Sequence, residues 1–394
     1  MMWLTTAAWL PMLLGSANAA QPYSSWMTDS MIAHGVSATR WYTEATFYRG
    51  VEAAHNISGL RTYQAFLASQ IDSILAPNGS FRSWDFQDHQ LDNIRIGSAI
   101  LYLYTLDPQP KYRAAADFLY DQLVHHQKRT PSGGFWHKDP KYPNQMWLDG
   151  LFMAGPFSAA YVALFFPPDN ATAAWDDIVL QFDLTEKHCR DSKTGMLRHG
   201  YDESLKAVWA DKATGASPHV WIRAQGWYLM ALADVLDWFP REYAAARGKL
   251  LGYFLDLARA VMAAQDAKTG GWWLVMDAPY PGQKGNYIES SGTAMYTYSL
   301  LKAVRMGYYA DAAERDVFAT AAQRAYGLMV DRFVATNGTK GTLNWEGTVR
   351  VGSLDAAGDF KYYTGIPVVE NSLIGVGPFI LASAEMEAYK ARNT

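Results

Sequence analysis

Asp149 is the acidic residue of this sequence that is best placed for acid–base chemistry. It interrupts the apolar run Trp-Leu-Asp149-Gly-Leu-Phe-Met, which is typical of the start of a buried helix. Burial takes water away from a carboxyl group and raises its pKa, so Asp149 is predicted to hold a proton near neutral pH. Asp is also a frequent cap at helix starts, and the residue alone leaves the catalytic and the structural interpretation open.

Two histidines lie in glycine-containing loops on either side of Asp149. His137 stands in Phe-Trp-His-Lys and His199 in Leu-Arg-His-Gly-Tyr-Asp, and we expect both at the mouth of a cavity. Neither shows the spacing of metal ligands on a helix, so we predict no catalytic metal and no other cofactor. The sequence also lacks a G-x-S-x-G elbow and a P-loop, which argues against hydrolases and nucleotide enzymes of those types.

Arg223 opens an apolar helix between two tryptophans, Trp221 and Trp227. In such a place a guanidinium group can make a forked contact with a carboxylate or stack on an aromatic ring. We favour recognition of a substrate carboxylate over a structural salt bridge.

The composition indicates one large globular domain. The 394 residues contain no Pro/Ser-rich linker and no charge run, and 49% are hydrophobic, which supports a single domain from residue 21 to 394. A net charge of −4 gives no basic face for nucleic acid. The 15 Trp and 24 Tyr suit stacking on sugars, although large helical proteins also use such residues to fill the core.

The first twenty residues are predicted to be a secretory signal. An apolar run from Leu4 to Leu14 is too short to span a membrane, and Ala17-Asn18-Ala19 fits a signal-peptidase site. We therefore expect a secreted, extracellular protein with no membrane partner. Four sequons predict glycosylation if the host is eukaryotic, and they begin at Asn56, Asn78, Asn170 and Asn337. The only cysteine, Cys189, excludes an internal disulfide.

Apolar residues recur at helical spacing along nearly the whole mature chain, which predicts an all-α protein with about twelve helices. The predicted helices are 24–35, 41–56, 60–76, 92–106, 112–129, 149–166, 171–190, 223–238, 242–266, 289–308, 314–335 and 373–390. Between them, a glycine followed by aromatic or apolar residues returns at intervals of roughly 55 to 75 residues. That interval is the length of a helical hairpin, so the pattern favours six hairpins closed into an (α/α)6 barrel. An open helical solenoid is the alternative.

If alternate helices form the inner wall of such a barrel, all of them begin at the same end. The exceptional polar and aromatic residues then surround one cavity. Those residues are Trp41, Tyr42, Asp92, Asp149, Trp221, Arg223, Glu289, Glu370 and Asn371. Helix N-termini carry positive dipole ends, so such a rim suits an anionic substrate, although helix capping could account for some of the acids.

Three motifs in the same order resemble glycoside hydrolase family 105, the unsaturated rhamnogalacturonyl and glucuronyl hydrolases. The motifs are Gly-Gly-Phe-Trp-His137-Lys with Trp-Leu-Asp149-Gly-Leu-Phe-Met, then Trp221-Ile-Arg223-Ala-Gln-Gly-Trp227, then Pro367-Val-Val-Glu-Asn-Ser-Leu-Ile-Gly-Val-Gly-Pro-Phe. The resemblance runs from Trp41 to the last helix and implies an (α/α)6 barrel. The loop before Asp149 is one residue longer than is usual for the family. Arg-Ala-Gln-Gly also stands where Arg-Gly-Asn-Gly is common.

The resemblance also implies roles for single residues. Asp149 falls on the catalytic acid/base and Asp92, in Leu-Asp92-Asn-Ile-Arg, on a second aspartate of the pocket. The positions that match sugar-binding residues are His137, His199, Trp221, Arg223 and Trp227. Trp41 and Tyr42 are added as substrate-binding candidates because they begin an inner helix. The implied partner is an oligosaccharide, and the oligomeric state stays open.

The implied substrate determines the expected chemistry. Polysaccharide lyases leave a terminal uronic acid with a C4=C5 double bond, which is an enol ether that is hydrated after protonation of C4. Asp149 would donate that proton and then accept one from water, while Asp92 would raise the pKa of Asp149 and hold the water or a hydroxyl. An ordinary inverting glycosidase that uses Asp92 and Asp149, and a non-catalytic carbohydrate-binding barrel, are the alternatives. Whether the sugar derives from galacturonate or glucuronate is left open.

Overall fold

The computed structural model describes residues 21–337 and 341–393, which form thirteen α-helices and four two-stranded sheets. The predicted signal segment, residues 1–20, lies outside the described residues. The helices are α1 (Tyr23–His34), α2 (Tyr42–Ser58), α3 (Arg61–Ile74), α4 (Gly97–Leu106), α5 (Pro110–Asp121), α6 (Leu148–Phe165), α7 (Thr172–Cys189), α8 (Ile222–Trp238), α9 (Ala244–Ala263), α10 (Ser290–Met306), α11 (Ala312–Arg332), α12 (Phe360–Gly365) and α13 (Leu373–Asn393).

Each predicted helix has a counterpart in the structure, but two of them are divided. A 3₁₀ turn at Leu91–Asn93 precedes α4, and a π-helical turn at Gln122–His126 continues α5. The six-residue helix α12 was not predicted. It is too short to show a helical period in its pattern of apolar residues.

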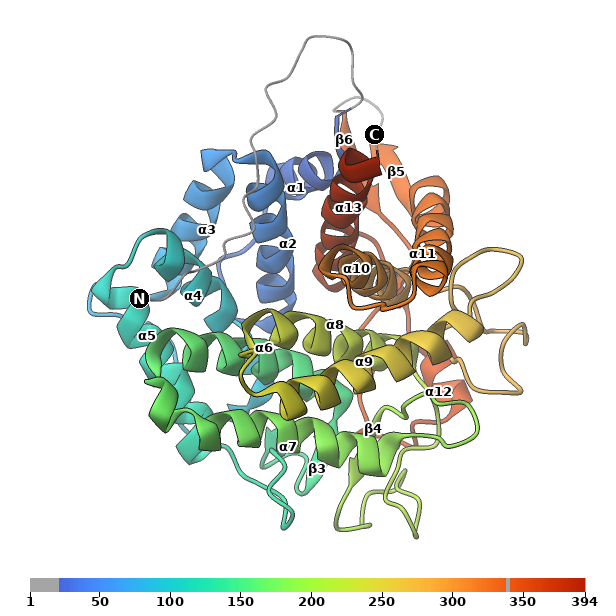
Figure 1. Ribbon diagram of the computed structural model, residues 1–394, viewed down its shortest axis with the longest axis horizontal. Helices are drawn as coiled ribbons and strands as arrows, with labels where there is room; N and C mark the ends of the chain where they lie inside the picture. Colours follow the sequence, from blue (N-terminus) through green and yellow to red (C-terminus); the bar gives the residue numbers. More distant parts are fainter. Residues whose placement is uncertain (1–20, 338–340, 394) are drawn as a thin grey trace.

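Six helices form a closed inner ring. In the order α2, α4, α6, α8, α10 and α13, each contacts the next, and α13 returns to α2. Figure 1 shows this closure where α2, in blue, lies beside α13, in dark red. The helices α1, α3, α5, α7, α9 and α11 pack outside this ring. The predicted (α/α)6 barrel is therefore confirmed, and the open solenoid is wrong.

Glycines allow the first and last inner helices to approach closely enough to close the ring. A Cβ atom on Gly377 in α13 would lie 2.4 Å from the carbonyl oxygen of Thr46 in α2. A Cβ atom on Gly50 would lie 3.0 Å from the carbonyl oxygen of Gly377. The Gly-Val-Gly sequence near the chain end thus serves helix packing, as small residues do where helix backbones approach one another.

The recurrent glycine pattern marks a turn that follows the outer helices. Gly79, Gly133, Gly195 and Gly270 have positive φ angles, which a residue with a side chain adopts at a cost. These turns follow α3, α5, α7 and α9 respectively. Gly341 follows α11 in the same way, with a φ of 64°. The repeat read from the sequence is therefore an outer helix, a glycine turn and a loop that leads to the next inner helix.

Short strands lie in the segments that lead into the inner helices. The antiparallel pairs are β1 (His89–Gln90) with β2 (Lys138–Asp139), β3 (Gln145–Trp147) with β4 (Gly200–Asp202), β5 (Val334–Asn337) with β6 (Thr342–Trp345), and β7 (Thr348–Val349) with β8 (Val368–Val369). The pair β1–β2 joins the loop before α4 to the loop before α6. The pair β3–β4 joins the loop before α6 to the loop before α8. Chain segments that lead into different inner helices are thus held at fixed positions.

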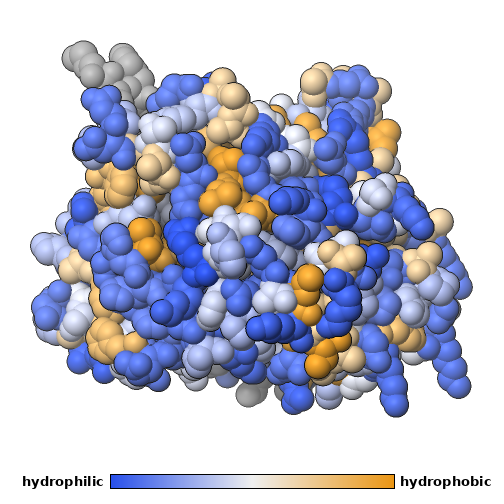
Figure 2. Space-filling model, turned by 90° about the horizontal axis from the view of Figure 1, so that it is seen from below, coloured by the Kyte–Doolittle hydropathy of each residue, from blue (hydrophilic) through white to orange (hydrophobic). Residues whose placement is uncertain are grey.

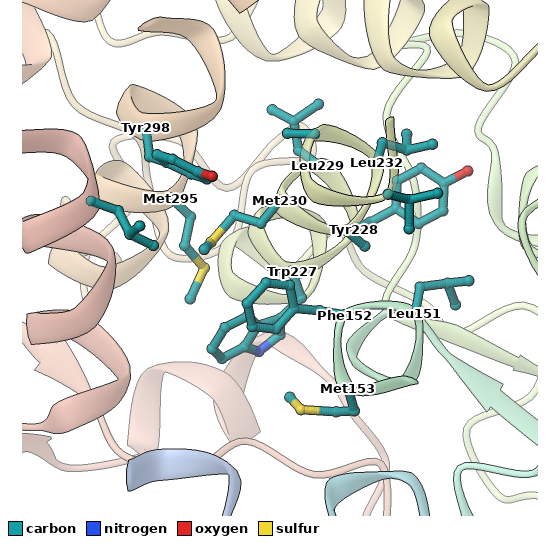
Figure 3. Packing of buried hydrophobic residues seen from close by; sticks show 14 of the residues in the cluster. Leu151, Phe152, Met153, Trp227, Tyr228, Leu229, Met230, Leu232, Met295 and Tyr298 are labelled. Carbon is teal, nitrogen blue, oxygen red and sulfur yellow. The ribbon is translucent and has the colours of Figure 1, made fainter. Parts of the chain in front are cut away.

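Apolar side chains fill the centre of the ring. Phe152 of α6 stacks on Trp227 of α8 with ring centroids 4.8 Å apart. Figure 3 shows this pair with Met153, Met230 and Met295 around the same space. Helix α6 is long and apolar enough to cross a membrane, but 72% of that window is buried inside the protein, as is typical of a core helix. The face in Figure 2 is mainly hydrophilic, with separate hydrophobic patches, which is ordinary for a protein surface.

Candidate active site

Asp149 lies in the first turn of α6, and its carboxylate faces a histidine from the next hairpin. Asp149 Oδ2 is 3.1 Å from His199 Nε2. The other ring nitrogen of His199, Nδ1, is 2.8 Å from the hydroxyl of Tyr363 in α12. His199 precedes β4, and its carbonyl accepts a hydrogen bond from the Leu148 N–H at 3.0 Å. Three buried side chains therefore form a line from α12 to the start of α6.

Asp149 does not act as a simple helix cap. The N-cap position of α6 is Trp147, and no side chain forms a cap hydrogen bond there. Burial opposes ionisation of Asp149, but His199 and His137 outweigh it, and the pKa of Asp149 lies below its ordinary value. The sequence-based expectation of a raised pKa is wrong for this arrangement, because two imidazoles face the carboxylate.

Asp92 is paired with a lysine that the sequence analysis did not single out. The 3₁₀ turn before α4 carries Asp92, and the pairing of β1 with β2 brings the next loop alongside. Asp92 Oδ2 is 2.7 Å from Lys138 Nζ, and Asp92 Oδ1 is 3.8 Å from His137 Nε2. Burial opposes the charge on Lys138, but Asp92 favours it, and the pKa of Lys138 is raised. The charge of Asp92 is therefore compensated at short range.

His137 lies deeper than predicted. It is 3% exposed and stacks on Trp147 with ring centroids 4.4 Å apart. Burial lowers the pKa of His137 to about 4, so the ring is neutral at pH 7. His199 is fully buried as well. Both histidines lie in loops, as predicted, but they are buried there rather than exposed at a cavity mouth.

Tyr42 lies within the electrostatic influence of both aspartates. It is the first residue of α2, and burial raises the pKa of its hydroxyl. The charges of Asp92 and Asp149 add to this rise, while the charge of Arg223 opposes it. Tyr42 therefore lies among three predicted site residues that come from three other inner-helix starts. Its neighbour Trp41 is 44% exposed and lies at the edge of this group.

Arg223 already has several partners inside the protein. Its terminal nitrogens donate to Ser291 Oγ at 3.2 Å, to the Val349 carbonyl at 2.6 Å and to the Arg350 carbonyl at 2.5 Å. Glu289 lies 3.9 Å away. Arg223 therefore links the start of α8 to the end of β7 and to the residue that follows it. Recognition of a substrate carboxylate by this guanidinium stays a prediction.

Trp221 is buried between Arg223 on one side and His199 and Tyr363 on the other. The Arg223 guanidinium carbon lies 4.7 Å from the centroid of the Trp221 ring. The centroid of the Trp221 ring also lies 4.8 Å from that of the His199 ring. It lies 5.5 Å from that of Tyr363, on which Trp221 stacks. Its indole Nε1 is buried and has no hydrogen-bond partner. Trp221 thus couples the position of Arg223 to that of His199.

The remaining predicted residues have partners inside the protein, and binding of a sugar by Trp227 stays a prediction. Trp227 is buried against Phe152, one turn further along α8 than Arg223 (Figure 3). Glu289 caps α10 by accepting a hydrogen bond from the Gly292 N–H at 2.8 Å. Glu370 and Asn371 hold β6, since they accept hydrogen bonds from Asn344 Nδ2 and from the Trp345 N–H. Helix capping therefore accounts for Glu289, and side-chain hydrogen bonds to β6 account for Glu370 and Asn371.

Two residues of the site were missed for different reasons. Lys138 follows His137 directly, so its place in the same motif was a usable signal. Tyr363 comes from a short helix far from every motif, and no pattern in the sequence pointed to it. Only the fold brings α12 against the start of α8, where Tyr363 meets Trp221.

The arrangement is suited to proton transfer. One carboxylate, that of Asp149, faces an imidazole ring, and a second, that of Asp92, faces an ammonium group. Aromatic rings surround both pairs, which lowers the local dielectric constant and strengthens the electrostatic interactions. Among the described residues, no group of three or more His, Cys, Asp or Glu side chains is placed to hold a metal ion.

Comparisons with known proteins identify the family and the fold of the chain. The model of Glycosyl Hydrolase Family 88 matches residues 20–390. A solved glycoside hydrolase of family 105 from C. acetobutylicum ATCC 824 is 34% identical, with a TM-score of 0.86 over 93% of this chain and 100% of that one. An unsaturated 3S-rhamnoglycuronyl hydrolase from Formosa agariphila is 25% identical over 312 residues, or 76% of each chain. An unsaturated glucuronyl hydrolase from Bacillus sp. GL1 is 15% identical, with a TM-score of 0.66 over 92% of this chain and 95% of that one, and shares the fold.

Proposed function

The chain belongs to the glycoside hydrolases of families 88 and 105, and from this premise we propose that it removes a 4,5-unsaturated uronic acid from the non-reducing end of lyase-generated oligosaccharides. The observation that carries the proposal is the buried line Asp149–His199–Tyr363 near the Asp92–Lys138 pair. Both aspartates act electrostatically on His137 and on Tyr42. Rhamnogalacturonan-type and glucuronan-type fragments are the substrate classes.

The first step is protonation of carbon. Asp149 gives a proton to C4 of the enol ether, the C4=C5 π bond supplies the electron pair, and positive charge develops at C5 and the ring oxygen. The ionised Asp149 left behind stabilises this charge. His199 holds the carboxylate in place from the side away from the sugar, and Tyr363 holds His199.

Addition of water completes the reaction. A water molecule attacks C5 as Asp149 accepts one of its protons, which restores the acid and leaves a hydroxyl group on C5. This hemiketal opens to a ketone at C5 with the ring oxygen as a hydroxyl on C1. The resulting hemiacetal at C1 then collapses to an aldehyde and releases the aglycone sugar. One water molecule is consumed in total.

Because the pKa of Asp149 is lowered in the free protein, Asp149 has to take up its proton when the substrate binds. The free site favours an ionised Asp149 because His199 and His137 face it. A bound uronate adds a negative charge and excludes water, and both effects raise the pKa of a nearby carboxyl group. We therefore assign protonation of Asp149 to the complex. Proton uptake on binding, measured by calorimetry in buffers of different ionisation enthalpy, tests this assignment.

Asp92 has a supporting role in this proposal. Lys138 compensates its charge, so Asp92 is fitted to accept hydrogen bonds from a sugar hydroxyl or from the attacking water rather than to donate a proton. An ordinary inverting glycosidase would instead use Asp92 as a base across a saturated glycosidic bond.

An ultraviolet assay distinguishes these reactions. The C4=C5 double bond conjugated to the carboxylate absorbs in the ultraviolet, and its hydration removes that absorbance. We expect loss of absorbance with lyase-generated rhamnogalacturonan or glucuronan oligosaccharides and no cleavage of the saturated counterparts. Cleavage of saturated oligosaccharides with the ultraviolet band unchanged would overturn the proposal in favour of the inverting glycosidase.

We also propose that the protein is exported, with residues 1–20 as its signal and the four sequons as candidate glycosylation sites. N-terminal sequencing of protein from culture medium tests this. A start near Ala20 or Gln21 is expected, and retention of residues 1–20 in the cell-associated protein would contradict it.

A further inference from the structure

A cavity with a volume of about 340 Å³ is lined by residues of the inner helices α2, α4, α6 and α8. In α6 it is lined by Pro156, which lies further along the helix than Asp149. In α8 it is lined by Asp234, which lies further along than Arg223. None of the side chains described for the candidate active site lines this cavity, which we name the rear cavity. Its volume lies within the range of sites that bind small molecules.

The rear cavity joins the protein surface to buried charges. Asn56, Thr105 and Trp238 line it and are exposed. Arg95 and Glu52 also line it, and they are only 1% and 4% exposed. A molecule that enters from the surface therefore meets charged groups at the floor of the cavity.

Arg95 differs from the other charged groups of this wall, because no carboxylate of the described residues forms an ion pair with it. Its Nη1 donates to Ser98 Oγ at 3.1 Å and to the Phe152 carbonyl at 3.5 Å. Its Nε and Nη2 are buried and have no hydrogen-bond partner within the described residues. These two nitrogens lie side by side on one edge of the guanidinium group, and such an edge matches the two oxygens of a carboxylate. Arg305 uses the same two nitrogens to hold Glu385, at 2.6 and 2.7 Å.

The other permanent charges around the rear cavity compensate one another. Arg49 Nε and Lys302 Nζ bind Asp234 at 3.2 and 2.8 Å. Lys302 Nζ also binds Asp237 at 2.6 Å. Two cations therefore face two carboxylates, and this group leaves no negative charge over for Arg95.

Glu52 is the remaining carboxyl group of the wall, and it compensates Arg95 only in part. Burial raises the pKa of Glu52 to about 7, so a large fraction of it is protonated at neutral pH. Burial also lowers the pKa of Arg95 to about 10, as expected for a cation with little compensation. Arg95 nevertheless stays charged at pH 7, and the floor of the cavity carries an excess of positive charge.

The rest of the wall is suited to a molecule with hydroxyl groups. Ser98, Tyr102 and Thr105 contribute hydroxyl groups, and Asn56 contributes an amide. Trp238 is 37% exposed, and an indole face suits the apolar C–H face of a pyranose ring. The volume of the cavity also exceeds what a single inorganic anion fills.

We propose that the rear cavity is a second binding site, for a small carboxylate that carries hydroxyl groups, such as a uronic acid monosaccharide. The free edge of Arg95 holds the carboxylate, and the hydroxyl and amide groups of the wall hold the rest of the molecule. The site is separate from the candidate active site and does not depend on the proposed function.

Calorimetric titration with galacturonate tests the site. Arg95→Met removes the guanidinium group, and a methionine still packs on the ring of Phe152, which lies 3.8 Å from the guanidinium carbon of Arg95. We expect affinity at the rear cavity to fall at least about tenfold in this variant. Galacturonate bound at the candidate active site would remain, so the expected result is the loss of one bound equivalent. Arg241→Met removes the same charge from an exposed position and should bind as the wild type does.

Galactose and inorganic phosphate test the class of ligand. Galactose has the ring and hydroxyl groups without the carboxylate, and phosphate has the charge without the ring. We expect both to bind at the rear cavity at least about tenfold more weakly than galacturonate. Equal binding of either probe would overturn the assigned ligand.

The same number of bound galacturonate molecules in the wild type and in Arg95→Met, or no binding to the wild type, would overturn the site itself. If Arg95→Met lowers the thermal unfolding midpoint, Ala160→Leu decides the matter. Ala160 lines the cavity and is 4% exposed, so a larger side chain there fills part of the space. We expect the loss of one bound equivalent in this variant as well, and unchanged binding would count against the proposal.

Discussion

Two groups of buried charges occupy opposite halves of the same barrel, and they are compensated in different ways. At the start of the inner helices, Asp149 faces His199. Further along the inner helices, Asp234 of α8 is bound by Arg49 Nε of α2 at 3.2 Å and by Lys302 Nζ of α10 at 2.8 Å. We name Arg49, Asp234 and Lys302 the rear cluster.

The two groups differ in the type of side chain that faces the buried aspartate. Arg and Lys keep their charge over the whole physiological pH range, so the rear cluster is a permanent ion-pair network. Burial opposes the charge on Asp234, but Arg49 and Lys302 outweigh it and hold the pKa of Asp234 far below its ordinary value. At the other end of the barrel, Asp149 faces the imidazole ring of His199 instead. The same barrel thus compensates one buried aspartate with permanent charges and pairs the other with an imidazole.

The largest effect on activity is expected for Asp149→Asn, which is matched by the same substitution at Asp234 in the rear cluster. Asp149→Asn removes the proposed proton donor, and we expect kcat/KM to fall by about 10³ to 10⁴, because amides do not transfer protons at neutral pH. Initial rates of ultraviolet bleaching measure this loss. Thermal unfolding should stay close to that of the wild type. A variant that keeps more than a tenth of the activity would remove Asp149 from the proposed role.

Asp234→Asn is the same change in the rear cluster and should give the opposite result. Loss of one partner from a buried ion pair leaves the other charges uncompensated, at a cost of about 3–5 kcal/mol in the free energy of unfolding. Urea denaturation measures this cost. In the folded fraction at low temperature, kcat/KM should stay within about threefold of wild type, since Asp234 does not contact the site. If Asp234→Asn kept its stability but lost its activity, the structural role assigned to Asp234 would be wrong.

Glu52, which lies near the rear cluster, is expected to make the free energy of unfolding depend on pH. Burial raises the pKa of Glu52 to about 7 from an ordinary value of 4.5, although Arg49 opposes the rise. Between these two values the folded protein binds more protons than the unfolded chain. Wild-type stability therefore contains a contribution that is complete below pH 4.5 and is lost as the pH rises through 7.

Glu52→Gln removes this contribution, and the difference in unfolding free energy between pH 4.5 and 7.5 should flatten by about 1–3 kcal/mol. Urea denaturation at several pH values provides the measurement. An identical pH dependence in the variant and the wild type would show that Glu52 is not the group responsible.

The smallest effect concerns how the site holds its histidine. Tyr363→Phe deletes the hydroxyl that lies 2.8 Å from His199 Nδ1, and we expect a three- to tenfold loss, about 1 kcal/mol, mainly in kcat. Tyr362→Phe, in the same helix, removes a hydroxyl that accepts a hydrogen bond from the Ser353 N–H instead. It should leave kcat within about twofold. Equal effects of both changes would make the role of Tyr363 merely structural.

The sequence predicted a large part of the fold because helices are local. Apolar residues at helical spacing marked every helix of the inner and outer rings, and the glycine repeat gave the hairpin unit. Helix α12 was missed because its six residues carry no period. The closure of the ring was inferred from the number of hairpins, while the actual contact depends on Gly50 and Gly377 lying opposite each other.

The sequence by itself determined which residues come to one end of the barrel, since parallel inner helices begin at the same end and Asp92, Asp149 and Arg223 stand at or near three of those starts. Tertiary structure alone decided what each residue meets there. A pKa is the sum of burial and all nearby charges, so the direction for Asp149 depended on His199 and His137, and Arg223 was occupied by carbonyl groups from a distant segment. Periodicity is encoded within a few turns of chain, whereas the electrostatics of the site join loops that are far apart in sequence.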